Sequence, residues 1–133
     1  MRRFSVTLFV LLIGAGPSRT SEACGERFCL PVGAKILSKK SPVHDFNLYL
    51  VNWRGAQFTI YEGNHPNDRG VTPSKTPLRL PLDPSATLRL DEGRGSVFLK
   101  IGEGWPEYLD VMGPCASESR CAAALFAGKL RKK

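Results

Sequence analysis

Four cysteines, one close pair toward each end of the chain, constrain the fold more than any other feature of this sequence. An even number of cysteines in an exported chain is typical of structural disulfides, which persist in an oxidising compartment. Four cysteines allow three pairings. We favour the local pairing, Cys24 with Cys29 and Cys115 with Cys121. The crossed pairings remain the alternative. They would tie the two chain ends together, and in the loop-entropy model their longer loops stabilise the fold more.

Zinc binding is the alternative role for these cysteines. Their Cys-x4-Cys and Cys-x5-Cys spacings differ from the tighter spacing that is typical of structural zinc ribbons. The chain also has no Cys-x-x-Cys redox pair. We therefore expect disulfides at all four positions, with no metal ion and no cofactor.

The N-terminus has the pattern of a secretory signal peptide. Residues 1–3 are positively charged, and Phe4–Ile13 is an apolar run interrupted only by one serine and one threonine. This run is shorter than the roughly 20 residues that a membrane-spanning helix needs, and no later segment is long enough. The small-x-small pattern at 21–23 predicts cleavage after Ala23, so that the mature chain begins at Cys24.

Cleavage at this position would also allow Cys24 to be acylated and to anchor the protein. A lipoprotein signal has an aliphatic residue three positions before the cysteine, and Ser21 does not fit that pattern. We therefore expect a secreted or periplasmic protein without a transmembrane segment. The short positive segment and the arginine, glycine and proline content favour a bacterial source.

The positive charge is concentrated at the C-terminus. The chain has 19 basic and 12 acidic residues, and residues 1–23 remove three arginines and one glutamate, which leaves 16 and 11, or +5. Residues 129–133 hold four of these charges, so the expected single β-rich domain, 24–128, is nearly neutral. A nucleic-acid binder normally carries a basic patch on its folded surface. Because the charge lies in the tail instead, we do not expect nucleic acid to be a partner. The Lys129–Lys133 tail is expected to be frayed, with weak contact to an anionic surface as the alternative.

Residues 46–62 show the period-two alternation of a β-hairpin. The first run has two faces, one with Phe46, Leu48 and Leu50, the other with Asn47, Tyr49, Val51 and Trp53. After a turn at 54–55, the second run directs Phe58 and Ile60 inward and Tyr61 outward. A second hairpin is expected where 87–90 and 96–101 flank 91–95, because Gly93 and Gly95 suit the positive φ values of a hairpin loop.

The remaining segments predict shorter elements. The alternating leucines of 78–82 include Pro81, which places that strand at an edge or makes it irregular. Residues 107–112 form a short candidate strand that ends at Gly113-Pro114. Ser117 is expected to cap a short helix that ends at Gly128. Together these elements predict a mainly β domain, a small antiparallel β-sandwich or barrel with a short C-terminal helix, stabilised by disulfides.

The most distinctive segment is the link from Gly63 to Pro77, which is rich in asparagine, proline and glycine. Structureless loops of this length are uncommon in compact domains and are often functional. The simpler interpretation is a surface turn, because the same residue types dominate turns. Together with nearby aromatic residues, the link supplies these candidate ligand or partner contacts: Tyr61, Asn64, His65, Asn67, Asp68, Arg69, Trp53 and Trp105.

A small secreted hydrolase is the alternative function. A metal-dependent version would use His44 and His65, although their spacing matches no metal signature. A carboxylate-dependent version would draw on an acidic and aromatic segment with Glu103, Glu107 and Asp110 near Trp105 and Tyr108. The glycine-flanked nucleophile elbow of serine hydrolases is absent. We therefore expect no catalytic residue, and we favour an exported binding or accessory protein, for example an inhibitor, whose partner is an envelope protein, a glycan or a small ligand.

Overall fold

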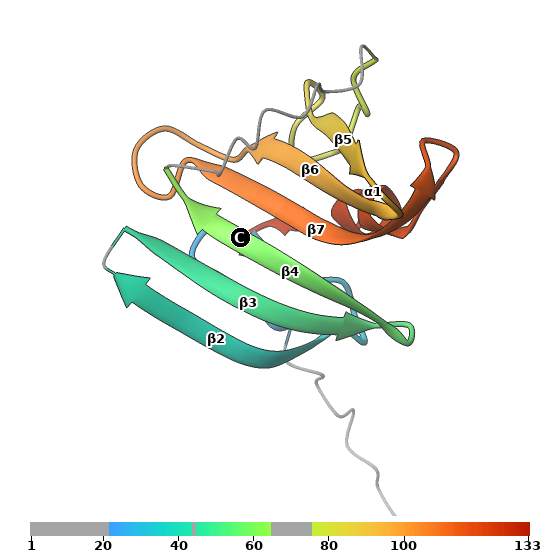
Figure 1. Cartoon of the computed structure of the whole chain (residues 1–133). Helices are drawn as coiled ribbons and strands as arrows, with labels where there is room; N and C mark the ends of the chain where they lie inside the picture. Colours follow the sequence, from blue (N-terminus) through green and yellow to red (C-terminus); the bar gives the residue numbers. More distant parts are fainter. Residues whose placement is uncertain (1–21, 44, 65–75) are drawn as a thin grey trace, which may run out of the picture.

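The computed structural model describes residues 22–43, 45–64 and 76–133 and shows a mainly β chain with two antiparallel sheets (Figure 1). The seven-stranded sheet has the order β2-β3-β4-β7-β6-β5, with β8 paired to β7, and the small sheet pairs β1 with β9. The elements are β1 (Phe28–Cys29), β2 (Lys35–Val43), β3 (Phe46–Trp53), β4 (Ala56–Gly63), β5 (Thr87–Asp91), β6 (Arg94–Lys100), β7 (Tyr108–Ser117), β8 (Arg120–Cys121), α1 (Ala122–Ala127) and β9 (Arg131–Lys132). The expected fold class is confirmed.

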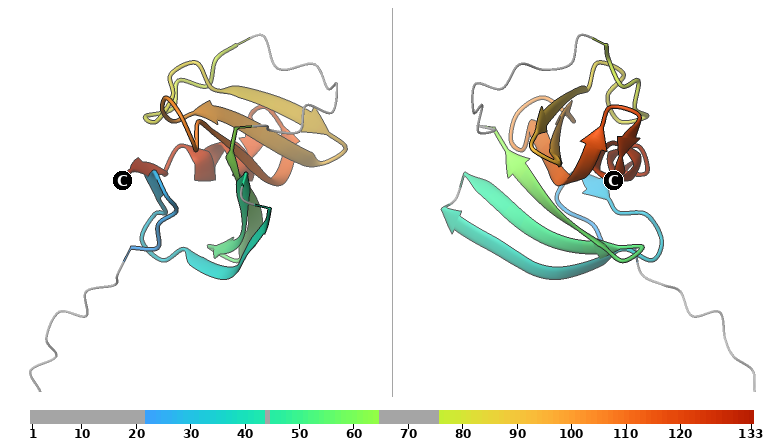
Figure 2. Two further views of the ribbon diagram at one scale, coloured as in Figure 1. Left: turned by 90° about the vertical axis from the view of Figure 1, so that its left-hand side faces the viewer. Right: turned by 45° about the vertical axis from the view of Figure 1, so that its right-hand side comes forward.

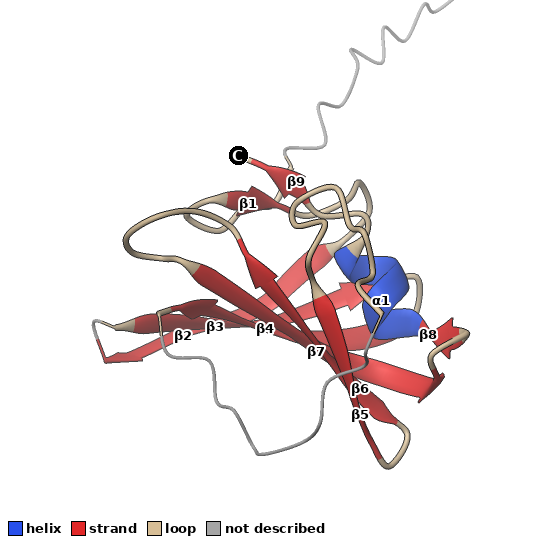
Figure 3. Cartoon of the chain, turned by 90° about the horizontal axis from the view of Figure 1, so that it is seen from above, coloured by secondary structure: helices blue, strands red, loops and turns tan. Residues whose placement is uncertain are grey.

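The hydrophobic core lies on one face of the large sheet, beneath α1 and the β1–β9 ribbon (Figure 3). Strands β3 and β6 bury alternate residues, because successive side chains of a strand point to opposite faces. The helix contributes Phe126, whose ring stacks on Phe58 with centroids 4.3 Å apart. On the ribbon side, Phe28 meets the Tyr49 ring edge-on at 5.7 Å. The covering elements thus each insert a phenylalanine into the core.

Both predicted hairpins are present, but the role of one glycine differs from the prediction. Gly93 has a φ of 80° in the β5–β6 turn, as a hairpin turn requires. Gly95, expected in the same loop, lies in β6 opposite Gly113. A Cβ atom on Gly95 would lie 2.8 Å from the Cβ of Cys115, so glycine is needed there for close packing.

Strand β7 is longer than predicted. The sequence places its end at Gly113-Pro114, yet the strand continues to Ser117. Proline is tolerated because β4 pairs with β7 only as far as Met112, so Pro114 lies beyond that ladder. The segment of alternating leucines, 78–82, forms no strand, which agrees with the irregular alternative allowed by Pro81.

The helix begins differently from the prediction. Cys121, not Ser117, is the N-cap residue of α1, and its sulfur accepts the backbone N–H of Ala124 at 3.4 Å. Ser117 instead belongs to β7, where its hydroxyl oxygen accepts the N–H of Arg120 at 3.2 Å. Gly128 ends the helix as expected.

The C-terminal segment is not the frayed tail that its composition predicts. Its Arg131 and Lys132 form β9 and pair with Cys29 and Phe28 of β1 (Figure 2). The preceding Leu130 is buried in the core. Because a two-residue strand has no alternation to detect, the sequence pattern cannot reveal this pairing.

Both disulfides have the predicted local connectivity. One joins Cys24 to Cys29, and the other joins Cys115 to Cys121. The first closes the turn before β1, whereas the second connects β7 to the residue that caps α1.

Candidate functional site

Three of the predicted contact residues come together at one end of the large sheet. We call this region the Trp105 end and define it by Asp45, Phe46, Tyr61, Asn64 and Trp105. It comprises the start of β3, the end of β4 and the β6–β7 loop, which all lie toward the left in Figure 1. The register explains the proximity, because Gly63 of β4 is paired with both Phe46 and Tyr108.

Trp105 is the most exposed large aromatic side chain of this region, with 42% of its surface accessible to solvent. Its indole Nε1–H donates a hydrogen bond to the carbonyl oxygen of Asp45 at 2.7 Å. The polar atom is therefore satisfied within the protein and the ring is held in one place. What remains for a partner is a preorganised aromatic surface.

The aromatic pair Phe46 and Tyr61 forms the base of this end. The two rings stack at 5.3 Å between centroids. A Cβ atom on Gly63 would lie 2.7 Å from the Tyr61 hydroxyl and 2.9 Å from the Asp45 carbonyl oxygen, so only glycine fits between them. Tyr61 points to the outer face, as expected, but this packing leaves it buried.

The β6–β7 loop is fixed at several points along its length. The Asn64 side-chain oxygen accepts the backbone N–H of Glu107 at 2.9 Å. On the opposite flank, the Arg27 guanidinium donates to the carbonyl oxygen of Glu103 at 2.8 Å. The backbone N–H of Ile101 donates to the Glu107 carbonyl oxygen at 2.8 Å and closes the loop. The loop that carries Trp105 thus has little conformational freedom to lose on binding.

The three carboxylates proposed for acid catalysis differ in their surroundings. Lys100 Nζ lies 3.1 Å from a carboxylate oxygen of Glu103 and 3.4 Å from one of Glu107. The hydrogen bond to Glu103 raises the pKa of Lys100 most, and the hydrogen bond to Glu107 raises it further. Glu103 and Glu107 therefore share one ammonium partner. Glu103 is also 88% exposed, while Asp110 is buried within the sheet.

Of the other predicted contact residues, Trp53 is buried and the rest lie outside the described residues. Trp53 is 5% exposed, packs on Phe126 at 5.4 Å and belongs to the core at the opposite end of β3. A core tryptophan and an exposed one give the same sequence signal. The predicted contacts His65, Asn67, Asp68 and Arg69 lie outside the described residues, as does His44 of the metal hypothesis.

The sequence interpretation missed Glu62, the fully buried carboxylate of the core face. Its Oε2 accepts the backbone N–H of Glu26 at 2.9 Å and that of Arg27 at 3.5 Å. Its Oε1 accepts the Tyr49 hydroxyl at 2.8 Å and the Asn47 amide at 3.2 Å. The pKa of Tyr49 is raised mainly by burial of its phenol, and the hydrogen bond to Glu62 raises it further. The network joins the N-terminal turn to the sheet and has a structural role.

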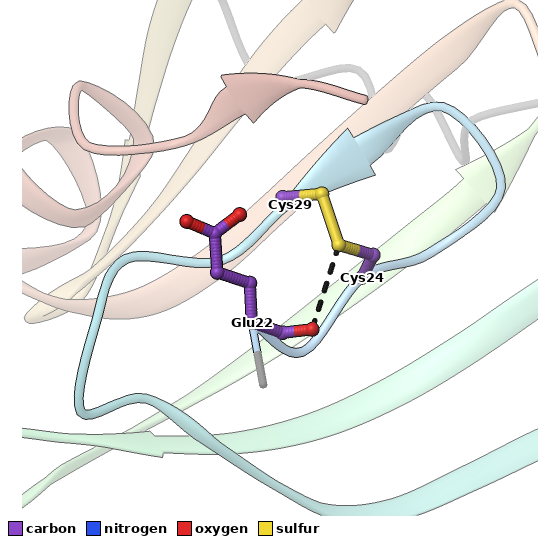
Figure 4. Close-up of side chains that lie close together, drawn as sticks. All are labelled: Glu22, Cys24 and Cys29. Atoms are coloured by element: carbon purple, nitrogen blue, oxygen red, sulfur yellow. Dashed lines mark hydrogen bonds between the residues drawn. A yellow bond between two sulfur atoms is a disulfide. The ribbon is translucent and has the colours of Figure 1, made fainter. Parts of the chain in front are cut away.

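Glu22, Cys24 and Cys29 form a group of three potential metal-ligand side chains among the described residues (Figure 4). The two sulfurs are bonded to each other, so neither is a thiolate that could bind zinc. The Cys24 sulfur lies 3.6 Å from the Glu22 carbonyl oxygen, and the Glu22 carboxylate pairs with Arg131 at 2.6 Å. This grouping is therefore a structural junction.

Across residues 22–43, 45–64 and 76–133, no helix is long and apolar enough to cross a membrane. No family model matches the chain, and comparison with curated proteins and with solved structures gives no significant match. The function of the Trp105 end therefore follows from its own chemistry alone.

Proposed function

We propose that this chain is an exported, non-catalytic binding or accessory protein that contacts its partner through the Trp105 end. The observation that carries the proposal is the fixed and exposed indole of Trp105, hydrogen-bonded to Asp45 and 42% accessible. Tryptophan is enriched among the residues that dominate the binding energy of protein interfaces. The leader-like N-terminus and the two disulfides support export to the periplasm or the medium.

The proposed partner is an envelope protein, a glycan or a small ligand. If the partner is a hydrolase, binding would inhibit it. An aromatic face beside carboxylate and amide groups suits both a protein side chain and a sugar ring. The link that follows Asn64 begins at this end of the sheet, so the predicted contacts His65, Asn67, Asp68 and Arg69 belong to the same proposal. The exposed lysines of 129–133 provide a weaker contact with an anionic surface.

A capture experiment tests the role of Trp105. The purified protein is immobilised and exposed to envelope extract and to a glycan array, and Trp105→Ala is compared with wild type. Leu125→Ala is the matched control, since Leu125 is 55% exposed on α1, away from the Trp105 end. We expect Trp105→Ala to lose at least ten-fold in captured partner while Leu125→Ala retains it.

The two variants must unfold at the same temperature as wild type for the comparison to hold. Neither side chain belongs to the hydrophobic core, so truncation removes little core packing. Equal capture by Trp105→Ala and wild type would contradict the proposed contact surface. Replacement of residues 65–75 by a Gly-Ser linker tests the link in the same assay.

A further inference from the structure

Ala23, which the small-x-small pattern assigns to the removed leader, is part of the folded domain. Its carbonyl oxygen accepts the backbone N–H of Leu30 at 2.8 Å. Leu30 is fully buried, and Ala23 itself packs against the core. A buried N–H that loses its acceptor costs free energy. Cleavage after Ala23 would remove this acceptor from a finished domain.

Glu22 is joined to the opposite end of the chain. Its Oε1 lies 2.6 Å from the guanidinium Nη2 of Arg131 in β9. The same guanidinium nitrogen donates to the carbonyl oxygen of Leu30 at 3.4 Å. Arg131 therefore holds Glu22 and the segment leading into β2 together, next to the β1–β9 pairing. Both leader-assigned residues, Glu22 and Ala23, make contacts that the mature fold uses.

Cys24 has a sulfur that is already committed to Cys29. A lipoprotein anchor requires a thioether on the sulfur of the first residue, so acylation and this disulfide exclude each other at Cys24. The disulfide and the Ala23 contact thus both disagree with a mature chain that begins at a lipidated Cys24.

We propose that the leader is removed by hydrolysis of a single peptide bond on the N-terminal side of Glu22. The mature protein then keeps Glu22 and Ala23, and its Cys24 forms a disulfide and carries no lipid. The step consumes one water molecule and releases the leader peptide. Small-x-small sequences also occur upstream, for example at 16–18, so the boundary has an alternative of the required type. This inference rests on the proposed export.

Mass spectrometry of the exported protein tests the boundary. The full chain is expressed in a bacterium, and the protein is recovered from periplasm and medium for N-terminal sequencing, intact mass and a non-reduced peptide map. We expect an N-terminus at or before Glu22, a mass without an acyl chain and an intact Cys24–Cys29 peptide. An N-terminus at Cys24, acylated or not, would overturn the inference while leaving export intact. Recovery of only the uncleaved chain in the cytoplasm would overturn both.

A variant of the full chain separates the two cleavage positions without depending on folding. Ala23→Gln places a large polar side chain at the last residue before the bond that the pattern predicts, where the peptidase requires a small residue. We expect Ala23→Gln to be processed as fast as wild type. A chain without Phe4–Ile13 is the control and should remain unprocessed. Accumulation of the Ala23→Gln precursor would place cleavage after residue 23 and overturn the inference.

Discussion

At the scale of single residues, Glu62 shows what the alternation pattern reveals and what it omits. Phe58, Ile60 and Glu62 share one face of β4, so the period alone places a carboxylate inside the core. The Asn47 position in β3 follows from the same parity. The backbone donors of Glu26 and Arg27 come from a distant turn, and only the tertiary fold brings them to the carboxylate.

Replacing Glu62 by glutamine should be strongly destabilising. The amide keeps the shape but loses the charge, and its NH2 group would face donors that now bind a carboxylate oxygen. We expect the free energy of unfolding to fall by about 2–4 kcal/mol in urea denaturation. Glu107→Gln, which alters a partly exposed ion pair with Lys100, should cost less than about 1 kcal/mol. Equal losses in the two variants would contradict the structural role of Glu62.

The raised pKa of Tyr49 predicts a stability loss in alkali. The unfolded phenol ionises near pH 10, about its ordinary value, whereas the buried phenol beside Glu62 stays protonated in the folded protein. The stabilisation is therefore complete below about pH 10 and declines as the pH rises above it, by up to about 1.4 kcal/mol per pH unit. Tyr49→Phe should show a shallower decline in chemical denaturation between pH 9 and 11. The same slope in both proteins would refute this assignment.

At the scale of elements, sequence pattern succeeds where a strand is long and alternates. The β3–β4 and β5–β6 hairpins follow from such runs. Strand β2 contains Pro42 and two register shifts, so its alternation is broken. The β1–β9 pair consists of two-residue strands that have no pattern at all. The Trp105 end could be predicted only as separate residues, because its assembly depends on the pairing of β4 with β7.

The two disulfides should differ in their contribution to stability. Their sequence separations, 5 and 6, are similar, and the loop-entropy model gives roughly 2 kcal/mol for each. Cys115 is buried against Gly95, and Cys121 caps α1, so the second pair also supports packing and the helix. We expect Cys115→Ala with Cys121→Ala to lose more stability in urea than Cys24→Ala with Cys29→Ala, because alanine cannot cap the helix. The reverse order would contradict this account of α1.

At the scale of the whole molecule, the chain closes on itself. The backbone N–H of Lys133 donates to the Arg27 carbonyl oxygen at 3.2 Å, and its ammonium group donates to the Gly25 carbonyl oxygen at 3.1 Å. The composition therefore locates the positive charge at the C-terminus, but it does not reveal that this segment is a folded strand. Residues 131–133 are therefore part of the fold, where they lie beside β1.

Deleting residues 129–133 should destabilise the protein, although composition alone predicts a dispensable tail. The deletion removes the buried Leu130 and the β1–β9 pairing, a loss of roughly 2–4 kcal/mol. Lys129→Gln with Lys132→Gln keeps the strand and removes exposed charge, and it should leave the unfolding temperature unchanged. Calorimetry that finds the deletion as stable as wild type would disprove the role of β9. The charge variant is also the proper test of contact with an anionic surface.

Cross-linking in living cells tests the proposed binding of a partner by the Trp105 end outside the cytoplasm. A photoactivatable residue replaces the 88% exposed Glu103, which leaves Trp105 intact, and a matched chain carries it at Leu125 on α1. We predict a partner adduct from position 103 in the periplasmic or secreted fraction. The adduct should be absent from position 125 and lost when Trp105→Ala is added. Equal adducts from both positions, or an adduct that persists without Trp105, would contradict the account.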